Sequence, residues 1–181
     1  MKRALFLDRD GVINIDHGYV WRIEDFTFTD GIFDLCRTAR QLGYMLVVVT
    51  NQSGIARGLF SEADYQQLTA WMQERFTAET VPLAAVYHCP FHPQAKLEAY
   101  RKDSSWRKPA PGMLLQAAAD LDLDLSHSIL IGDKEDDITA ARAAGLAAAI
   151  RLADPAGITG EADETFASLD EIRTWLKRHA N

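Results

Sequence analysis

The sequence of 181 residues contains only two cysteines, Cys36 and Cys89, which are too few for a framework of disulfide bonds. Cys36 falls on the apolar face of a predicted helix, where a buried free thiol is the ordinary interpretation. No apolar run is long enough to span a bilayer. Two basic residues lead directly into the first predicted strand, which leaves no room for a secretory leader. We therefore expect a cytoplasmic protein that does not engage the membrane.

Basic residues are also scarce: 19 Lys and Arg face 26 Asp and Glu, so the formal net charge is −7. Proteins bind phosphate backbones through a surplus of positive charge, and this balance therefore argues against nucleic acid as a partner. A small phosphorylated metabolite remains compatible, because one metal ion and a few local cations can hold one phosphate. Internal repeats, low-complexity linkers and strong apolar surface patterns are missing as well. We expect a single domain over residues 1–181 that works as a monomer.

What the sequence does contain is an apolar run at residues 4–7 that leads into Asp8, Asp10 and Gly11. A run without alternation predicts a strand buried on both faces, as in a parallel sheet covered by helices. In such sheets, ligands bind beyond the carboxyl ends of the strands. Two acids at this edge repel each other unless a cation lies between them, and oxygen ligands suit Mg²⁺. A capping Asp followed by a turn Gly is the alternative interpretation of this motif taken alone.

Strand and helix patterns alternate along the rest of the chain. Strands are predicted at 45–49, 83–87, 128–131 and 147–152, and helices at 31–43, 61–77, 109–121, 138–144 and 168–179. This alternation predicts a doubly wound parallel α/β sheet, a Rossmann-type three-layer fold with right-handed crossovers. Residues 12–30 and the polar segment 88–108 show no clear period, and we expect both to form loops of the kind that carry function.

The predicted topology brings further polar residues to the edge that holds Asp8 and Asp10. Phosphoryl transfer needs a nucleophile, an acid, a cation and fixed donors. Asp8 is the predicted nucleophile, which forms an aspartyl-phosphate, and Asp10 is the predicted general acid and base. Mg²⁺ would be held by a carboxylate oxygen of Asp8, the backbone carbonyl of Asp10 and Asp133.

Three other groups complete this predicted site. The hydroxyl of Thr50 and the backbone N–H of Asn51 can donate to phosphoryl oxygens, and Lys108 adds a positive charge. Each motif taken singly also fits a turn, an exposed lysine or a helix cap. Their order at successive strand ends favours the active site. Asp136 and Asp137 suit either a helix N-terminus or the metal site, and we place Asp137 behind Asp133 as a metal-site residue.

In this order the residues follow the pattern Asp-x-Asp, Ser/Thr, Lys and acidic loop, so the chain resembles the phosphatases of the haloacid dehalogenase (HAD) superfamily. It is more closely similar to the D-glycero-D-manno-heptose 1,7-bisphosphate phosphatases, with the histidinol-phosphate phosphatases as near relatives. The most specific segments are Leu7–Asn14, His17–Val20, Val49–Gly58, Arg107–Pro109 and Gly132–Lys134.

This resemblance implies a HAD-like fold without a large cap domain, Mg²⁺ as cofactor, and removal of the 7-phosphate from a heptose bisphosphate. It also implies that Arg107 recognises the distal phosphate or the sugar and that Lys134 assists at the phosphate. The remaining residues that it implies in substrate contact are Asp16, His17, Gly18, Tyr19, Thr50, Asn51, Gln52 and Ser53.

One segment departs from the family pattern. The family's zinc loop carries Cys-x-His and then Cys-x-Cys directly before Arg-Lys-Pro, whereas Phe91, Ser104 and Trp106 replace all but Cys89 here. Structural zinc takes four N or S ligands, and Cys89 with His88 and His92 supplies at most three. We therefore predict that zinc is absent and that Phe91 and Trp106 hold the loop by apolar packing. A loop without zinc also leaves the choice of sugar phosphate and of its anomer open.

Other functions remain as alternatives. A receiver domain that accepts a phosphoryl group also gathers acids, a Ser/Thr and a Lys at strand ends, but its acceptor follows a middle strand and needs no acid such as Asp10. A phosphatase that only binds its ligand is disfavoured because every catalytic position is intact. Histidinol phosphate stays open as a substrate, whereas the acidic balance disfavours the ends of nucleic acids.

Overall fold

The structure is a computed structural model that describes residues 2–153, 156 and 160–179. Six parallel strands in these residues form one sheet in the order β3-β2-β1-β4-β5-β6. The strands are β1 (Arg3–Leu7), β2 (Tyr44–Asn51), β3 (Ala85–Cys89), β4 (Ile129–Gly132), β5 (Ala148–Leu152) and β6 (Glu164–Phe166). The predicted doubly wound parallel sheet is confirmed. Within the described ranges, every helix is too short or too polar to cross a membrane.

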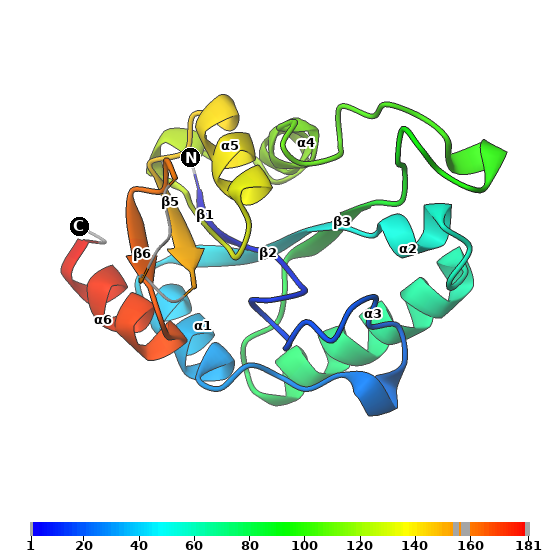
Figure 1. The fold of residues 1–181 in the computed structure, drawn as a ribbon. Coiled ribbons are helices and arrows are strands. Elements are labelled where there is room, and N and C mark those ends of the chain that lie inside the picture. The colour runs from blue at the N-terminus through cyan, green and yellow to red at the C-terminus, as the bar shows by residue number, and fades with distance from the viewer. Residues whose placement is uncertain (1, 154–155, 157–159, 180–181) are drawn as a thin grey trace.

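Helices cover both faces of the sheet, with α1, α3 and α6 on one side and α4 and α5 on the other (Figure 1). The helices are α1 (Ile32–Gln41), α2 (Ser53–Ala56), α3 (Glu62–Ala78), α4 (Gly112–Leu121), α5 (Glu135–Ala144) and α6 (Leu169–His179). Three short 3-10 helices, η1 (Ile23–Asp25), η2 (Glu98–Tyr100) and η3 (Leu125–His127), lie in the connections. The fold is therefore the expected three-layer α/β/α arrangement.

Strand β1 lies in the middle of the sheet, between β2 and β4, and this position explains its apolar run. Leu5 and Leu7 pack in the core beneath α1, α3 and α6, whereas Ala4 and Phe6 pack in the core beneath α4 and α5. All four side chains are fully buried. Successive side chains of a strand point to opposite faces of the sheet, so a strand covered on both sides must be apolar at every position.

Several boundaries differ from the sequence predictions. Strand β6 was not expected, because its residues Glu-Thr-Phe form no apolar run and are at most half-buried. Strand β3 begins at Ala85 rather than at residue 83, α4 begins at Gly112, and α5 begins at Glu135 rather than at residue 138. A single helical turn, α2, follows the end of β2. Ser61 and Asp64 form a capping box at the start of α3.

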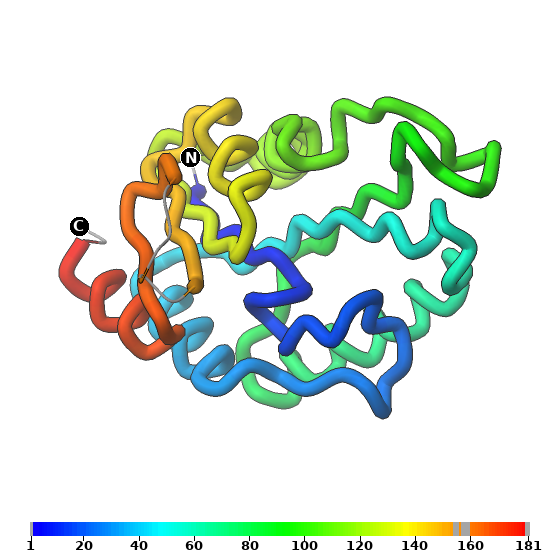
Figure 2. The backbone as a smooth tube through the Cα atoms, in the orientation of Figure 1, coloured from blue at the N-terminus to red at the C-terminus, as the bar shows by residue number. Residues whose placement is uncertain are grey.

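The two loops expected from their lack of periodicity lie beyond the same edge of the sheet. The tube in Figure 2 shows residues 12–30 passing over α3, and the segment after β3 extending past α2 before it returns to α4. The backbone N–H of Leu97 donates to the carbonyl of Ala56, which ties this second loop to α2. Both loops therefore border the carboxyl ends of the central strands.

Candidate active site

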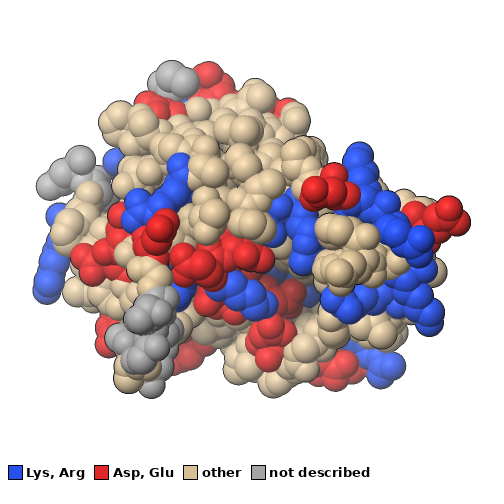
Figure 3. Space-filling model, turned by 45° about the horizontal axis from the view of Figure 1, so that its top comes forward, with Lys and Arg blue, Asp and Glu red and all other residues tan. Residues whose placement is uncertain are grey.

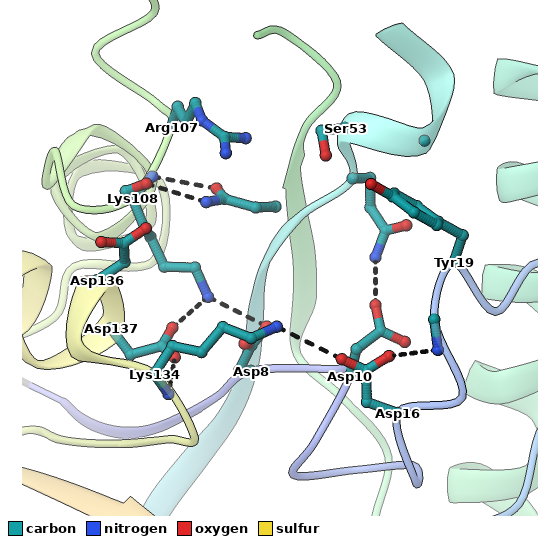
Figure 4. Close-up of a pocket in the computed structure, with 14 residues that line it drawn as sticks. Asp8, Asp10, Asp16, Tyr19, Ser53, Arg107, Lys108, Lys134, Asp136 and Asp137 are labelled. Carbon is teal, nitrogen blue, oxygen red and sulfur yellow. Dashed lines mark hydrogen bonds and ion pairs between the residues drawn. The ribbon is translucent and has the colours of Figure 1, made fainter. Parts of the chain in front are cut away.

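The carboxyl ends of β1, β2 and β4 meet at a pocket of about 320 Å³. Asp8 directly follows β1, and its backbone N–H donates to the carbonyl of Ile131 in β4. Side chains from the segment after β1, the 12–30 loop, the end of β2, α2, the loop before α4 and the start of α5 surround the pocket (Figure 4). The predicted site residues that line it are Asp8, Asp10, Asp16, Gly18, Tyr19, Asn51, Gln52, Ser53, Arg107, Lys108 and Lys134.

Lys108 is almost completely buried, with 2% of its surface exposed. Its Nζ lies 3.1 Å from Oδ1 of Asp8 and 2.5 Å from Oδ1 of Asp137, and it donates to the carbonyl of Val49. Burial lowers the pKa of a lysine, but the charges of Asp8 and Asp137 outweigh this effect and raise the pKa of Lys108 above its usual range. Lys108 is therefore a fixed positive charge beside the predicted nucleophile.

The carboxylate of Asp8 needs more positive charge than Lys108 provides. The pKa of Asp8 is raised to about 8. Burial is the largest cause, the charge of Asp137 acts in the same direction, and the charge of Lys108 partly opposes both. Asp8 attacks as a carboxylate, so a cation nearby favours its reactive form at neutral pH.

A site for such a cation lies next to Asp8. Asp8, Asp133 and Asp137 each offer an oxygen atom, and these atoms lie within 4.8 Å of one another. Oδ1 of Asp133 is buried and finds no hydrogen-bond partner among the described residues, as befits an atom available to a metal ion. Carboxylate oxygens are the ligands that Mg²⁺ prefers. The residues present therefore fit Mg²⁺.

Gly11 allows the loop that carries Asp8 and Asp10 to approach Asp133. Its φ of +89° is a left-handed conformation, and a Cβ atom here would lie 2.3 Å from Oδ2 of Asp133. Any side chain at this position would therefore collide with the acidic loop. This explains why the motif needs glycine directly after its second carboxylate.

Asp10 receives hydrogen bonds from three side chains. Arg9 Nη2 lies 2.9 Å from Oδ1 and 3.0 Å from Oδ2 of Asp10. Asn14 Nδ2 donates to Oδ1 over 3.0 Å, and Gln52 Nε2 donates to Oδ2 over 2.9 Å. The carboxyl group that we predict as acid and base is thus held in one orientation at the wall of the pocket.

Thr50 and Asn51 are the last two residues of β2, which extends past the predicted strand end at residue 49. Thr50 is buried, its hydroxyl accepts a hydrogen bond from Gln52 Nε2, and it is not among the residues that line the pocket. The side-chain amide of Asn51 exchanges two hydrogen bonds of 3.0 Å with the backbone N–H and carbonyl of Lys108. Asn51 therefore fixes the segment that carries the buried lysine.

The rim of the pocket carries the residues implied by the family resemblance. Lys134 Nζ lies 3.4 Å from Oδ2 of Asp16, so this pair bridges the 12–30 loop and the start of α5. Nη1 of Arg107 is buried and finds no partner within the described chain, which leaves it available to an anionic group. His17 is exposed and borders a separate depression formed by residues 17–27, so the structure does not bring it to the pocket.

Positive charge is concentrated at the end of the molecule that carries the 88–108 loop (Figure 3). Arg57, Lys96, Arg101 and Lys102 are exposed there. Acidic side chains gather near the centre of the same view, and most of the remaining surface is neither basic nor acidic. The acidic chain thus offers cations next to its pocket, as a phosphorylated ligand requires.

The 88–108 loop packs through Phe91 and Trp106, as predicted from the sequence. Phe91 and Trp106 are half-buried against the core beneath α4, and the Trp106 ring meets Tyr87 edge-to-face at 6.1 Å. The three residual candidates for zinc have other contacts. Cys89 is buried with Sγ 4.0 Å from the carbonyl of Phe91, His88 pairs with Glu62, and Nδ1 of His92 accepts from the backbone of Gln94.

The structure also brings to the site residues that the sequence prediction underrated. Asp137 was placed behind Asp133, yet it contacts Lys108 directly and shares the cluster of carboxylates. It is the third residue of α5, and its Oδ2 accepts from the backbone N–H of Lys134. An acid in the first turn of a helix signals only a cap, so its second contact depends on where the sheet places Lys108. Arg9 was not predicted at all.

Comparison with known proteins agrees with this geometry. Residues 105–167 match the family model of HAD-hydrolase-like proteins. The chain is 53% identical, over 84% of its own length and 80% of the relative, to a D-glycero-alpha-D-manno-heptose-1,7-bisphosphate 7-phosphatase of Burkholderia mallei. It is 47% identical, over 97% of its length and 95% of the relative, to a D-glycero-beta-D-manno-heptose-1,7-bisphosphate 7-phosphatase of Salmonella typhi.

A solved structure shares the whole fold. The D,D-heptose 1,7-bisphosphate phosphatase of B. bronchiseptica, complexed with magnesium and phosphate, superposes with a TM-score of 0.83 at 28% identity. The match covers 98% of this chain and 99% of that one. Since the sequence relatives are matched over most of their length as well, the chain belongs to the D-glycero-D-manno-heptose 1,7-bisphosphate 7-phosphatase family of HAD-like hydrolases.

Proposed function

We propose that this protein is a Mg²⁺-dependent phosphatase that removes the 7-phosphate from D-glycero-D-manno-heptose 1,7-bisphosphate. The observation that carries the proposal is the meeting of Asp8 and Lys108 in one pocket, with the carboxylate of Asp133 beside Asp8 and its Oδ1 without a hydrogen-bond partner among the described residues. Arg107 at the rim of the same pocket offers a cation for a second phosphate. A sugar that carries a phosphate at each end matches this arrangement.

The reaction follows from the positions of the two acids. A carboxylate oxygen of Asp8 attacks phosphorus, and the bond from phosphorus to the ester oxygen breaks while protonated Asp10 gives its proton to that oxygen. The dephosphorylated sugar leaves as an alcohol. Asp10, now a carboxylate, takes a proton from a water molecule that attacks the aspartyl-phosphate. The bond from phosphorus to Asp8 then breaks, which releases phosphate and restores both acids.

Other groups hold the phosphoryl group during both steps. Lys108, the hydroxyl of Thr50 and the backbone N–H of Asn51 would donate to its oxygens. Mg²⁺ would be held by the carboxylates of Asp8 and Asp133 and the backbone carbonyl of Asp10, and when bound it supplies positive charge that offsets the repulsion between Asp8 and the phosphate.

A substrate panel tests this function. With Mg²⁺ present, we expect phosphate release from heptose 1,7-bisphosphate at a kcat/KM at least about tenfold above that for histidinol phosphate, because only the bisphosphate can engage Arg107 with its second phosphate. Both heptose anomers belong in the panel, since relatives named for each are similar to this chain. Phosphate release can be followed by a colorimetric assay. A failure to hydrolyse any phosphomonoester would refute the proposal. A preference for histidinol phosphate would show that this compound, rather than the heptose bisphosphate, is the substrate.

We also propose that the enzyme works without zinc, as packing of Phe91 and Trp106 against the core supports. Metal analysis of the purified protein is then expected to find zinc well below one equivalent. Treatment with EDTA should abolish activity, and Mg²⁺ alone should restore it, because the carboxylate cluster around Asp8 is the one group in the described part of the chain that is arranged to hold a metal ion. Stoichiometric zinc that resists dialysis would contradict this prediction.

We further propose that the protein is a cytoplasmic monomer with no nucleic-acid or membrane partner. The net charge of −7 supports the first exclusion. Light scattering at micromolar concentration would measure its oligomeric state.

A further inference from the structure

Arg9 lies between the two predicted catalytic acids, yet it is not among the residues that line the pocket. Its side chain is the largest of the fully buried side chains among the described residues, with 1% of its surface exposed. Taking a guanidinium out of water is costly unless its hydrogen bonds are replaced. Nη1 of Arg9 finds no partner among the described residues, and the contacts of Nε and Nη2 show what this residue does.

The guanidinium of Arg9 joins two parts of the active site. Its Nη2 contacts both oxygens of Asp10, and Nε contacts Oδ1 over 3.3 Å. The same Nη2 donates to the backbone carbonyl of Val20 over 2.6 Å, next to Tyr19 at the pocket. The plane also lies near the ring of Tyr65, whose centroid is 6.0 Å away. Arg9 thus connects Asp10 to the 12–30 loop.

We propose that Arg9 is a positioning residue that holds Asp10 in the orientation needed to protonate the leaving oxygen; this rests on the function proposed above. Among the described donors to Asp10, Arg9 alone contacts both oxygens and carries a charge. Asn14 and Gln52 each contact one oxygen and are neutral. Without Arg9, each oxygen of Asp10 keeps a single neutral donor, which holds the carboxyl group less firmly than a charged guanidinium does.

The leaving group separates this role from a purely structural one. An alkyl phosphate needs an acid, because its alkoxide is a poor leaving group. The leaving groups of p-nitrophenyl phosphate and acetyl phosphate are stable anions, which depart without a proton. The ratio kcat/KM reports phosphoenzyme formation, the step in which the leaving group departs. A loss of Asp10 positioning must therefore slow the alkyl substrate selectively, whereas general damage to the pocket slows both kinds.

The test compares the wild type with Arg9→Lys and Arg9→Gln. We expect kcat/KM for heptose 1,7-bisphosphate to fall about 10- to 100-fold, more in Arg9→Gln, while kcat/KM for the activated phosphates changes less than about threefold. Arg151→Lys is the matched control, because Arg151 is also buried, pairs with Glu135 and does not line the pocket. Its kcat/KM values for the heptose and for the activated phosphates should both stay near those of the wild type.

Equal losses for both kinds of substrate, or no loss for the heptose, would overturn the role of Arg9. Arg9→Lys retains the charge and is the variant to use if Arg9→Gln does not fold. Failure of the proposed function is distinguishable, because in that case the wild-type protein itself releases no phosphate from the heptose.

Discussion

Replacing Asp8 with Asn is expected to reduce phosphate release from heptose 1,7-bisphosphate by at least about 10⁴-fold. The amide has the shape of the carboxylate but lacks its nucleophilic oxygen. It can still accept from the backbone N–H of Arg9 and from Lys108, which contact Oδ1 of Asp8 at 2.7 and 3.1 Å. Burial disfavours the charge of Asp8, so a neutral side chain should fit there without loss of the fold. Phosphate assay and circular dichroism measure the two effects.

A surface substitution provides the control for this result. Asp120→Asn makes the same chemical change in α4, away from the residues that line the pocket, and should leave kcat unaltered. The wild-type enzyme, quenched with acid during turnover, should also carry phosphate on the peptide that contains Asp8. Substantial turnover by Asp8→Asn would place the nucleophile elsewhere.

Replacing Lys108 with Met is expected to affect both stability and catalysis. Without its ammonium group, the buried Asp8 and Asp137 must either repel each other as carboxylates or take up a proton, and the loss of their shared partner should lower the free energy of unfolding by about 3 kcal/mol in metal-free protein. Loss of a fixed charge at the phosphoryl group should reduce kcat by about 10²- to 10³-fold. Denaturant unfolding without metal and steady-state kinetics with Mg²⁺ measure the two effects separately.

Lys134→Met is the matched control for stability. Its side chain is 60% exposed and lies 3.4 Å from Asp16, so solvent screens the pair and the free energy of unfolding should change by less than about 0.5 kcal/mol. Unfolding of Lys108→Met at the wild-type denaturant concentration would show that Asp8 and Asp137 do not depend on this lysine. Addition of Mg²⁺ should recover part of the stability lost in Lys108→Met, because a cation beside Asp8 binds only the folded chain.

The layered fold and the edge that bears the site are both readable from the order of residues. Apolar runs such as Ala4–Leu7 report burial on two faces, and their alternation with helical periods specifies a parallel sheet. Once strands are parallel, polar residues at their carboxyl ends must gather, which is why Asp8, Asp10 and Asn51 were found together. Strand β6 escaped prediction because an edge strand that is only partly buried needs no apolar run.

The chain order alone therefore specified the α/β layers and the edge of the sheet where the acids collect, because both depend on local patterns of apolar and polar residues. The partners of each acid came from packing between segments distant in sequence. Lys108 reaches Asp137 across 29 positions, and Asn51 reaches Lys108 across 57. Arg9 turns toward Asp10 and Val20 because the 12–30 loop closes over it. Such contacts depend on how distant segments pack together, and no pattern of residue spacing in the sequence reveals them.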